Sequence, residues 1–280
     1  MKIINFTELT LELAAAGCMV LDMPNDAYHA YAGISKSGLD VIARSPAHFK
    51  YRPKHEPSRA MVIGSATHAA VLEPTVFNKQ YALLKEVTDR RSAEYKQAVK
   101  LHGADNVLIC GEIDQIAGMQ AALNKNKYAA ELLVANGWCE IACFATDPET
   151  GVLVKCKFDK LLNNLQSVDL KTTLDVREFY KSVANYRYHV QEAFYSDVFE
   201  WATGEQINGF DFLAVEKEMP HASRIFRLDS NAVQYGRKLY REALNTYADC
   251  IQQNKWPMPP GDLEYIGLPN WASDPEQQEF

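Results

Sequence analysis

The chain has 280 residues, of which 47% are hydrophobic and 23% are charged, so we expect one globular domain that spans residues 1–280. The formal net charge of −7 excludes a protein that binds polyanions nonspecifically through a broad basic surface. No run of about eighteen apolar residues occurs, and acidic residues interrupt the apolar amino-terminal stretch, which predicts a cytoplasmic protein without membrane association.

The amino-terminal part, residues 1–60, is predicted to be helical. The segment ISKSGLDVIARSPAHFKYRP (34–53) is typical of two short helices. Ser35 or Ser37 would cap the first, and Ser45 followed by Pro46 would open the second, because a serine N-cap and a proline at the first helical position favour helix starts.

Three further helices are predicted before residue 138. The segment MVIGSATHAAVLEP (61–74) combines apolar and small residues, as expected for a tightly packed helix that stops at Pro74. Apolar residues spaced by three and four predict amphipathic helices over 92–103 and 112–137.

The periodicity changes from helical to alternating at Trp138. Residues 138–173 alternate and are interrupted by DPETG and NNLQS, which predicts three antiparallel strands joined by tight turns. A long helix is expected over 176–202 and ends before Gly204, followed by strands over 209–220 and 224–229 and a closing helix over 231–255. The order predicts an α/β fold with a central mixed sheet flanked by helices, followed by a tail over 257–280.

The pattern VDLKTT at residues 168–173 places two charged side chains on one face of a strand. Strand periodicity puts Asp169 and Lys171 on the same side, while Leu170 points into the core. The turn at Asn163 and Asn164 would bring Asp159 of the preceding strand back toward Asp169. Two carboxylates and a lysine would then meet at one edge of the sheet.

Such a group of residues suits metal-assisted hydrolysis of a phosphodiester. Asp159 can bridge metal ions, Asp169 and the carbonyl of Leu170 can complete a coordination shell, and Lys171 can orient or deprotonate the attacking water. Hard oxygen ligands favour Mg²⁺, with Mn²⁺ as a substitute. The six cysteines are scattered and predict no zinc or iron–sulfur site. Solvated surface charges are the alternative interpretation of the two aspartates and the lysine.

Two helical patterns accompany these carboxylates. Gly64 and His68 lie one helical turn apart, so the glycine can allow close approach to the sheet while the histidine points at the carboxylates. Gln191 and Tyr195 share one face of the later helix. A hydrogen-bonded core histidine and an ordinary amphipathic face remain the alternatives.

The combination GxxxH, D, DxK and QxxxY in this order resembles the RecB-like branch of the PD-(D/E)XK nuclease superfamily. The segments ISKSGLDVIARSPAHFKY, GSATHAAVLEP, TDRRSAEYK, VDLKTT and YRYHVQEAFYSD are similar to RecE-type (exonuclease VIII) domains and their phage-encoded relatives. The resemblance covers residues 28–257 and implies a nuclease core over 61–256. It implies that His68, Asp159, Asp169 and Lys171 are the metal and catalytic residues, with Gln191 and Tyr195 as DNA-facing support.

The resemblance also implies an activity and its partners. It implies a Mg²⁺-dependent exodeoxyribonuclease that digests linear duplex DNA 5′ to 3′ and leaves 3′ single strands for recombination. Its partners would be duplex DNA ends, a single-strand annealing protein of RecT type, and further copies of this chain in a homo-oligomer. A PD-(D/E)XK endonuclease and a non-catalytic DNA-binding recombination scaffold are the alternatives.

Five more residues have an open role in the sequence. Glu140 can add a third carboxylate or serve a structural role, and Arg90 and Arg91 can contact phosphates or form a solvated pair. Ser35 and Ser37 can bind a terminal 5′-phosphate through backbone amides or cap a helix.

Overall fold

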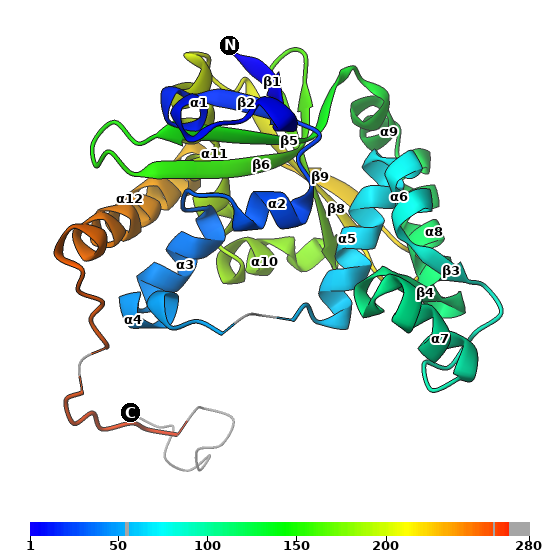
Figure 1. Ribbon diagram of the computed structural model, residues 1–280. Coiled ribbons are helices and arrows are strands. Elements are labelled where there is room, and N and C mark those ends of the chain that lie inside the picture. Colours follow the sequence, from blue (N-terminus) through cyan, green and yellow to red (C-terminus); the bar gives the residue numbers. More distant parts are fainter. Residues whose placement is uncertain (54–55, 260, 269–280) are drawn as a thin grey trace, which may run out of the picture.

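A seven-stranded mixed sheet forms the centre of the computed structural model, which describes residues 1–53, 56–259 and 261–268 (Figure 1). In spatial order its strands are β1 (Ile3–Asn5), β2 (Cys18–Leu21), β5 (Gly137–Thr146), β6 (Leu153–Leu162), β7 (Gln166–Thr173), β8 (Gly209–Glu216) and β9 (Ser223–Phe226). The short strands β3 (Ala82–Leu84) and β4 (Val107–Ile109) pair separately. The predicted α/β fold with a central mixed sheet is confirmed.

Helices precede, interrupt and follow these strands. They are α1 (Leu11–Ala16), α2 (Asn25–Ala30), α3 (Lys36–Arg44), α4 (Pro46–Lys50), α5 (Arg59–Leu72), α6 (Pro74–Gln80), α7 (Ala93–His102), α8 (Cys110–Lys125), α9 (Lys127–Val134), α10 (Phe179–Asn185), α11 (Tyr188–Thr203) and α12 (Ser230–Gln253). The serine and proline signals at 45 and 46 do open α4, because the Ser45 side chain accepts a hydrogen bond from the amide of His48.

Strands β6 and β7 separate soon after their connecting turn. Their antiparallel register contains only the pairs Lys160 with Val168 and Leu161 with Ser167. Strand β7 is instead paired in parallel with β8 along its whole length, from Gln166 to Thr173. The two strands therefore form a fork, by which we mean the opening between β6 and β7 that begins at Asp159 and Asp169.

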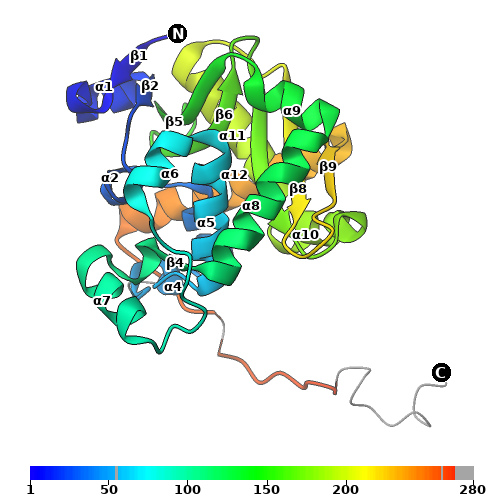
Figure 2. The ribbon, with the colours of Figure 1, turned by 90° about the vertical axis from the view of Figure 1, so that its right-hand side faces the viewer.

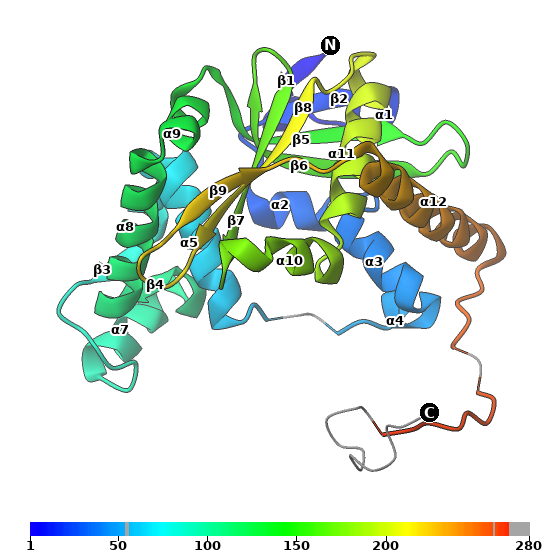
Figure 3. The same ribbon diagram turned by 180° about the vertical axis from the view of Figure 1, so that it is seen from behind.

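Both faces of the sheet are covered by helices. One core cluster joins the sheet to α3, α10, α11 and α12, of which α10, α11 and α12 lie in front in Figure 3. A second cluster packs α5, α8 and α9 on the opposite face, which Figure 2 turns toward the viewer. Successive residues of β8 pack into opposite clusters, with Phe212 in the first and Leu213 in the second, because neighbouring side chains of a strand point to opposite faces.

The amino-terminal part differs from the prediction of a helical segment. Strand β1 pairs in parallel with β2, and β2 pairs antiparallel with β5, so the first 21 residues extend the sheet. These strands are three and four residues long. Such short segments show little local periodicity, and their partner β5 is remote in the sequence, which is why the pattern did not reveal them.

Two predicted helices are divided. The helix expected over 112–137 is α8 followed by α9, with Asn126 capping the second through its side chain. The helix expected over 176–202 is a short 3₁₀ turn (Val176–Glu178), then α10 and α11, with the break at Tyr186 and Arg187. Arg187 adopts a left-handed conformation (φ 55°), which ends the helical hydrogen bonding there.

All six cysteines are free thiols, and Cys18, Cys143, Cys156 and Cys250 are buried. Among the residues that the structure describes, none of the helices has both the length and the apolar character needed to cross a bilayer. The tail predicted over 257–280 has neither helix nor strand up to residue 268, and residues 260 and 269–280 lie outside the described part.

Candidate active site

Asp159 and Asp169 face the fork from its two sides. Asp159 lies on β6 and Asp169 on β7. The backbone hydrogen bonds between the two strands have stopped at this point. A side chain takes their place, because Oδ2 of Asp159 accepts a hydrogen bond of 2.8 Å from the amide of Leu170. The predicted convergence of the two aspartates at one position is therefore present in the structure.

His68 reaches the fork from helix α5. Its Nδ1 lies 3.3 Å from Oδ2 of Asp159. The predicted reason for Gly64 is not supported, since a methyl group there would lie 3.9 Å from Oγ1 of Thr172, an ordinary contact distance. The helix would thus accept alanine at this position without moving from the sheet.

Asp169 is held from the other face of the sheet by helix α11. Nε2 of Gln191 donates a hydrogen bond of 2.5 Å to Oδ1 of Asp169, and the ammonium of Lys171 forms an ion pair with Oδ2. A continuous sheet would separate His68 on α5 from Gln191 on α11. The fork removes this barrier, so groups from both helical layers meet around the same carboxylates.

Tyr195, the second residue of the QxxxY pattern, is partly buried and packs against the core. Its ring packs edge-on against Phe158, with ring centroids 5.4 Å apart, and against Phe210 at 6.3 Å. The structure therefore brings Gln191, but not the ring of Tyr195, into contact with the acidic residues. Tyr195 supports the position of β6 through the core.

Glu140 completes the group of potential metal ligands. The register pairs Cys139 with Lys160 and Ile141 with Phe158, so Glu140 stands opposite Asp159 on the neighbouring strand. Its backbone has φ 50°, a strained conformation for a residue within a strand, and strain of this kind gathers at functional sites. One ligand atom from each of His68, Glu140 and Asp159 lies within 4.8 Å of the others.

The donor set fits a hard divalent cation. Two carboxylates and one imidazole supply oxygen and nitrogen ligands, which suit Mg²⁺ or Mn²⁺. Among the described residues, the buried Oδ2 of Asp169 accepts no well-aligned hydrogen bond and faces only the Lys171 ammonium. A buried carboxylate oxygen whose partner is a single ammonium, beside three potential ligands, is an arrangement that a cation would stabilise.

The electrostatics of the two aspartates differ. Burial raises the pKa of Asp169 to about 6, against the attraction of Lys171 and with a further contribution from Asp159. Burial acts in the same direction on Asp159, but His68, Lys171 and the Leu170 amide outweigh it and lower the pKa of Asp159. Although burial opposes it, the carboxylates raise the pKa of Lys171, so this lysine remains an ammonium at neutral pH in the metal-free protein.

The remaining residues with an open role lie outside this group. Arg90 pairs with the buried Glu112, which Arg59 also binds, and Arg91 pairs with Asp89 on the surface. Arg90 thus has a structural contact that the sequence did not reveal.

Ser35 stands at the N-cap position of α3 but does not cap it with its side chain. Its hydroxyl lies 3.1 Å from the hydroxyl of Ser37 instead. The structure therefore removes the simple helix-capping interpretation of Ser35 without testing a role in phosphate binding.

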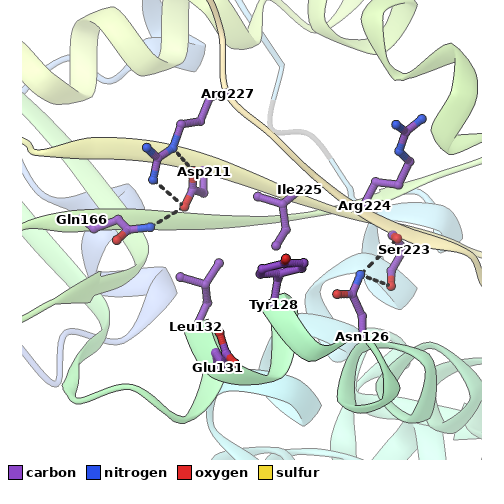
Figure 4. A pocket seen from close by; sticks show the side chains of 10 residues that line it. All are labelled: Asn126, Tyr128, Glu131, Leu132, Gln166, Asp211, Ser223, Arg224, Ile225 and Arg227. Atoms are coloured by element: carbon purple, nitrogen blue, oxygen red, sulfur yellow. Dashed lines mark hydrogen bonds and ion pairs between the residues drawn. The ribbon is translucent and has the colours of Figure 1, made fainter.

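A separate cavity of about 590 Å³ lies between α9 and β9, away from the fork (Figure 4). Asp211 on its wall is paired with Arg227 and accepts a hydrogen bond from Gln166. None of the residues lining this cavity belongs to the acidic group at the fork. The candidate active site is therefore an open fork rather than the large cavity.

A forked mixed sheet that carries D, DxK, a histidine from the preceding helix and a glutamine from the following one defines a PD-(D/E)XK-type protein. Residues 35–269 match the family described as "PDDEXK-like domain of unknown function (DUF3799)", and the chain belongs to this family. A solved structure from Eubacterium rectale, described as a "putative exonuclease", is similar with a TM-score of 0.59 and 16% identity, covering 86% of this chain and 97% of the other. A search of curated proteins finds no match.

Proposed function

We propose that this chain is a divalent-metal-dependent nuclease that hydrolyses phosphodiester bonds of DNA at the fork. The observation that carries the proposal is the convergence of His68, Glu140 and Asp159 within 4.8 Å of one another, next to the ion pair of Asp169 and Lys171. Membership of the PDDEXK-like family supports it, because this superfamily uses divalent metals.

The roles of the residues follow from their contacts. His68, Glu140 and Asp159 would hold the cation, and Asp169 with the Leu170 carbonyl would complete its ligands. A bound divalent ion would neutralise charge that builds on the phosphate during attack by water. Lys171 would orient the attacking water and the phosphate, or accept a proton from the water once a bound cation competes for the carboxylates that raise the pKa of this lysine. Gln191 fixes the orientation of the Asp169 carboxylate through their hydrogen bond.

The finer proposal is an exodeoxyribonuclease that digests linear duplex DNA from 5′ ends. The sequence resemblance to RecE-type domains supports this direction, and the description of the Eubacterium rectale neighbour supports an exonuclease without giving a direction. We further propose that the resulting 3′ single strands pass to a RecT-type annealing partner. Several copies of the chain would surround the DNA, which would keep an acidic subunit of net charge −7 on an acidic substrate.

The alternatives use the same fold differently. A DNA-binding scaffold would have no use for the three potential metal ligands His68, Glu140 and Asp159, so the site geometry disfavours it. An endonuclease would keep the same ligands, and only the substrate distinguishes it from an exonuclease.

The direct test is digestion of a linear duplex carrying a label at its 5′ or 3′ end, with Mg²⁺, with Mn²⁺ and with chelator. We expect metal-dependent release of the 5′ label first and survival of covalently closed circles. Early loss of the 3′ label would reverse the polarity, and rapid nicking of circles would favour the endonuclease. No metal-dependent cleavage of any DNA would refute the nuclease proposal.

Variants at the fork test the site itself. Asp159→Asn and Asp169→Asn should each lower the cleavage rate by at least about a hundredfold, because each removes a charge that supports the metal ions. Asp89→Asn, which alters a surface carboxylate paired only with Arg91, is the matched control and should cleave normally. Near-normal activity in either fork variant would remove that residue from the site.

Two further variants test the metal ligands. His68→Ala and Glu140→Gln should each increase the Mg²⁺ concentration needed for half-maximal cleavage, since each leaves a coordination position open. Glu140 also pairs with Lys157 at 2.9 Å, so a Lys157→Met variant separates the two roles. If Lys157→Met mimics Glu140→Gln in metal requirement, Glu140 acts through its structural pair rather than as a ligand.

A further inference from the structure

The corner between α10 and α11 holds an exposed aromatic ring in a strained backbone. Tyr186 is 63% exposed, and the next residue, Arg187, has φ 55°. A left-handed conformation at a residue other than glycine costs on the order of 1 kcal/mol and persists only where the surroundings enforce it. Burial of Tyr186 does not explain this cost, because its ring is turned toward solvent.

Helix α3 braces this corner from a distant part of the sequence. Nζ of Lys36 donates a hydrogen bond of 2.6 Å to the carbonyl of Tyr186 and forms an ion pair with Asp40 at 2.8 Å. Asp40 in turn lies 3.1 Å from Nε of Arg187 in a second ion pair. These contacts from α3 thus hold the exposed ring of Tyr186 in a fixed place.

A stack of rings connects Tyr186 to the lysine of the fork. The rings of Tyr186 and Tyr188 are stacked, with centroids 5.8 Å apart and an interplanar angle of 27°. The ammonium of Lys171 lies 4.8 Å from the centroid of Tyr188. Tyr188 is fixed in turn by stacking on Phe212 at 5.6 Å. One tyrosine ring therefore separates Lys171 from the exposed ring of Tyr186.

We propose that Tyr186 is a stacking platform for an unpaired base of the DNA strand whose phosphate lies at the fork. This inference rests on the proposed nuclease function and adds the form of the substrate that enters the site. Aromatic rings stack on bases of any sequence, with a gain of about 1–3 kcal/mol per base. Lys36 and Arg187 share the single carboxylate of Asp40, so this group keeps one net positive charge that can attract an adjoining phosphate.

The platform would favour a frayed end over a paired one. The terminal base of an intact duplex already stacks on its neighbour and pairs across the helix, so Tyr186 offers most to a base that has left the duplex. Stacking on Tyr186 would offset part of the cost of opening the terminal pair. The site would therefore receive a single strand, even when the substrate is a duplex.

The test uses 2-aminopurine, a fluorescent base that is quenched on stacking, near the end of an oligonucleotide with phosphorothioate linkages that resist cleavage. Wild type should quench the probe in an unpaired end. Tyr186→Ala should abolish the quenching and weaken single-strand binding about tenfold, while Tyr186→Phe should retain both. Tyr180→Ala is the matched control, because Tyr180 is an equally exposed tyrosine on α10 (66%).

Cleavage kinetics provide the second readout. Tyr186→Ala should lower kcat/KM by a similar factor, about tenfold, for a blunt duplex and for a duplex whose terminal bases are mismatched, because the terminal base is unpaired in the transition state of both and loses the same stacking energy. Unchanged quenching in Tyr186→Ala, or an unchanged kcat/KM on both substrates, would overturn the platform. If wild type quenches the probe but cleaves no DNA, the nuclease proposal fails and the stacking site stands. If wild type cleaves DNA without quenching the probe, the stacking proposal fails and the nuclease proposal stands.

Discussion

The two aspartates of the fork contribute to stability in opposite directions. The pKa of Asp169 is raised from its ordinary 3.8 to about 6, so the folded metal-free protein prefers this carboxyl protonated. Its stabilising contribution is full below pH 3.8 and is lost as the pH rises through about 6. The pKa of Asp159 is lowered, so its contribution is present above pH 3.8 and is lost as the pH falls through that lowered value.

At pH 7.5 without metal, Asp169→Asn should therefore unfold at a higher temperature than wild type, and Asp159→Asn at a lower one. Asparagine at position 169 imitates the neutral carboxyl that the folded state prefers. The free energy of unfolding should therefore rise by up to about 2 kcal/mol. At position 159, asparagine removes the partner of His68. Thermal unfolding at pH 7.5 and pH 5 measures both effects, and the gain from Asp169→Asn should shrink at the lower pH. Shifts of the same sign in both variants would contradict this account.

The residues of the fork were largely predictable from the sequence, because strand periodicity and a short turn already place Asp159, Asp169 and Lys171 together. The contribution of Glu140 was only one of two open interpretations. Its position opposite Asp159 follows from the register of β5 and β6. That register could have been predicted by counting residues outward from the turn that joins the two strands. Its left-handed backbone could not have been predicted, because nothing local in the sequence favours it.

At the scale of the element, two helical glycines have different surroundings. A methyl group at Gly236 of α12 would lie 2.1 Å from the backbone carbonyl of His189, at the start of α11. A methyl group at Gly64 of α5 would meet only Thr172, at 3.9 Å. The close packing of α12 on α11 thus depends on glycine, whereas the packing of α5 on the sheet does not.

Gly236→Ala should lower the free energy of unfolding by about 2 kcal/mol or more, because the two helices must move apart. Gly64→Ala should leave it unchanged or raise it by up to about 1 kcal/mol, since alanine favours a helix over glycine. Chemical denaturation of the metal-free variants measures both. A Gly64→Ala variant as unstable as Gly236→Ala would show that α5 requires its glycine.

The break between α10 and α11 shows why helix boundaries were harder to predict than helices. The sequence around Tyr186 contains neither glycine nor proline, so the apolar pattern continues through it. The groups that hold the break, Lys36 and Asp40, come from α3. Contacts between elements so remote in sequence do not appear in a local pattern, and they override helix propensity here.

At the scale of the whole molecule, a cation should stabilise the fold. The fork gathers Glu140, Asp159 and Asp169 in a chain of net charge −7, so a divalent ion that binds only the folded state relieves local repulsion. Mg²⁺ or Mn²⁺ at about a hundred times its Kd should raise the free energy of unfolding by about 2.7 kcal/mol. The Tm should then rise by roughly 5 °C or more.

The measurement is thermal unfolding with increasing metal, compared with Asp159→Asn and Asp89→Asn. The first variant should lose the shift, and the surface variant should keep it. An equal shift in all three proteins would place the stabilising ion elsewhere on the molecule.

The hydrogen bond from the Leu170 amide to Asp159 couples the main chain of β7 to the proposed metal ligand. A cation that draws electron density from this carboxylate would weaken the bond, while holding β6 and β7 together would protect the amide from solvent. The amide of Leu170 is thus a built-in spectroscopic probe, whose proton chemical shift should move upfield on metal binding while its hydrogen exchange slows. Strand β2 offers a reference, because the Met19 amide donates a hydrogen bond of 2.9 Å to the carbonyl of Lys2 in a distant part of the same sheet. A single backbone proton could then report occupancy of the site before any substrate is known.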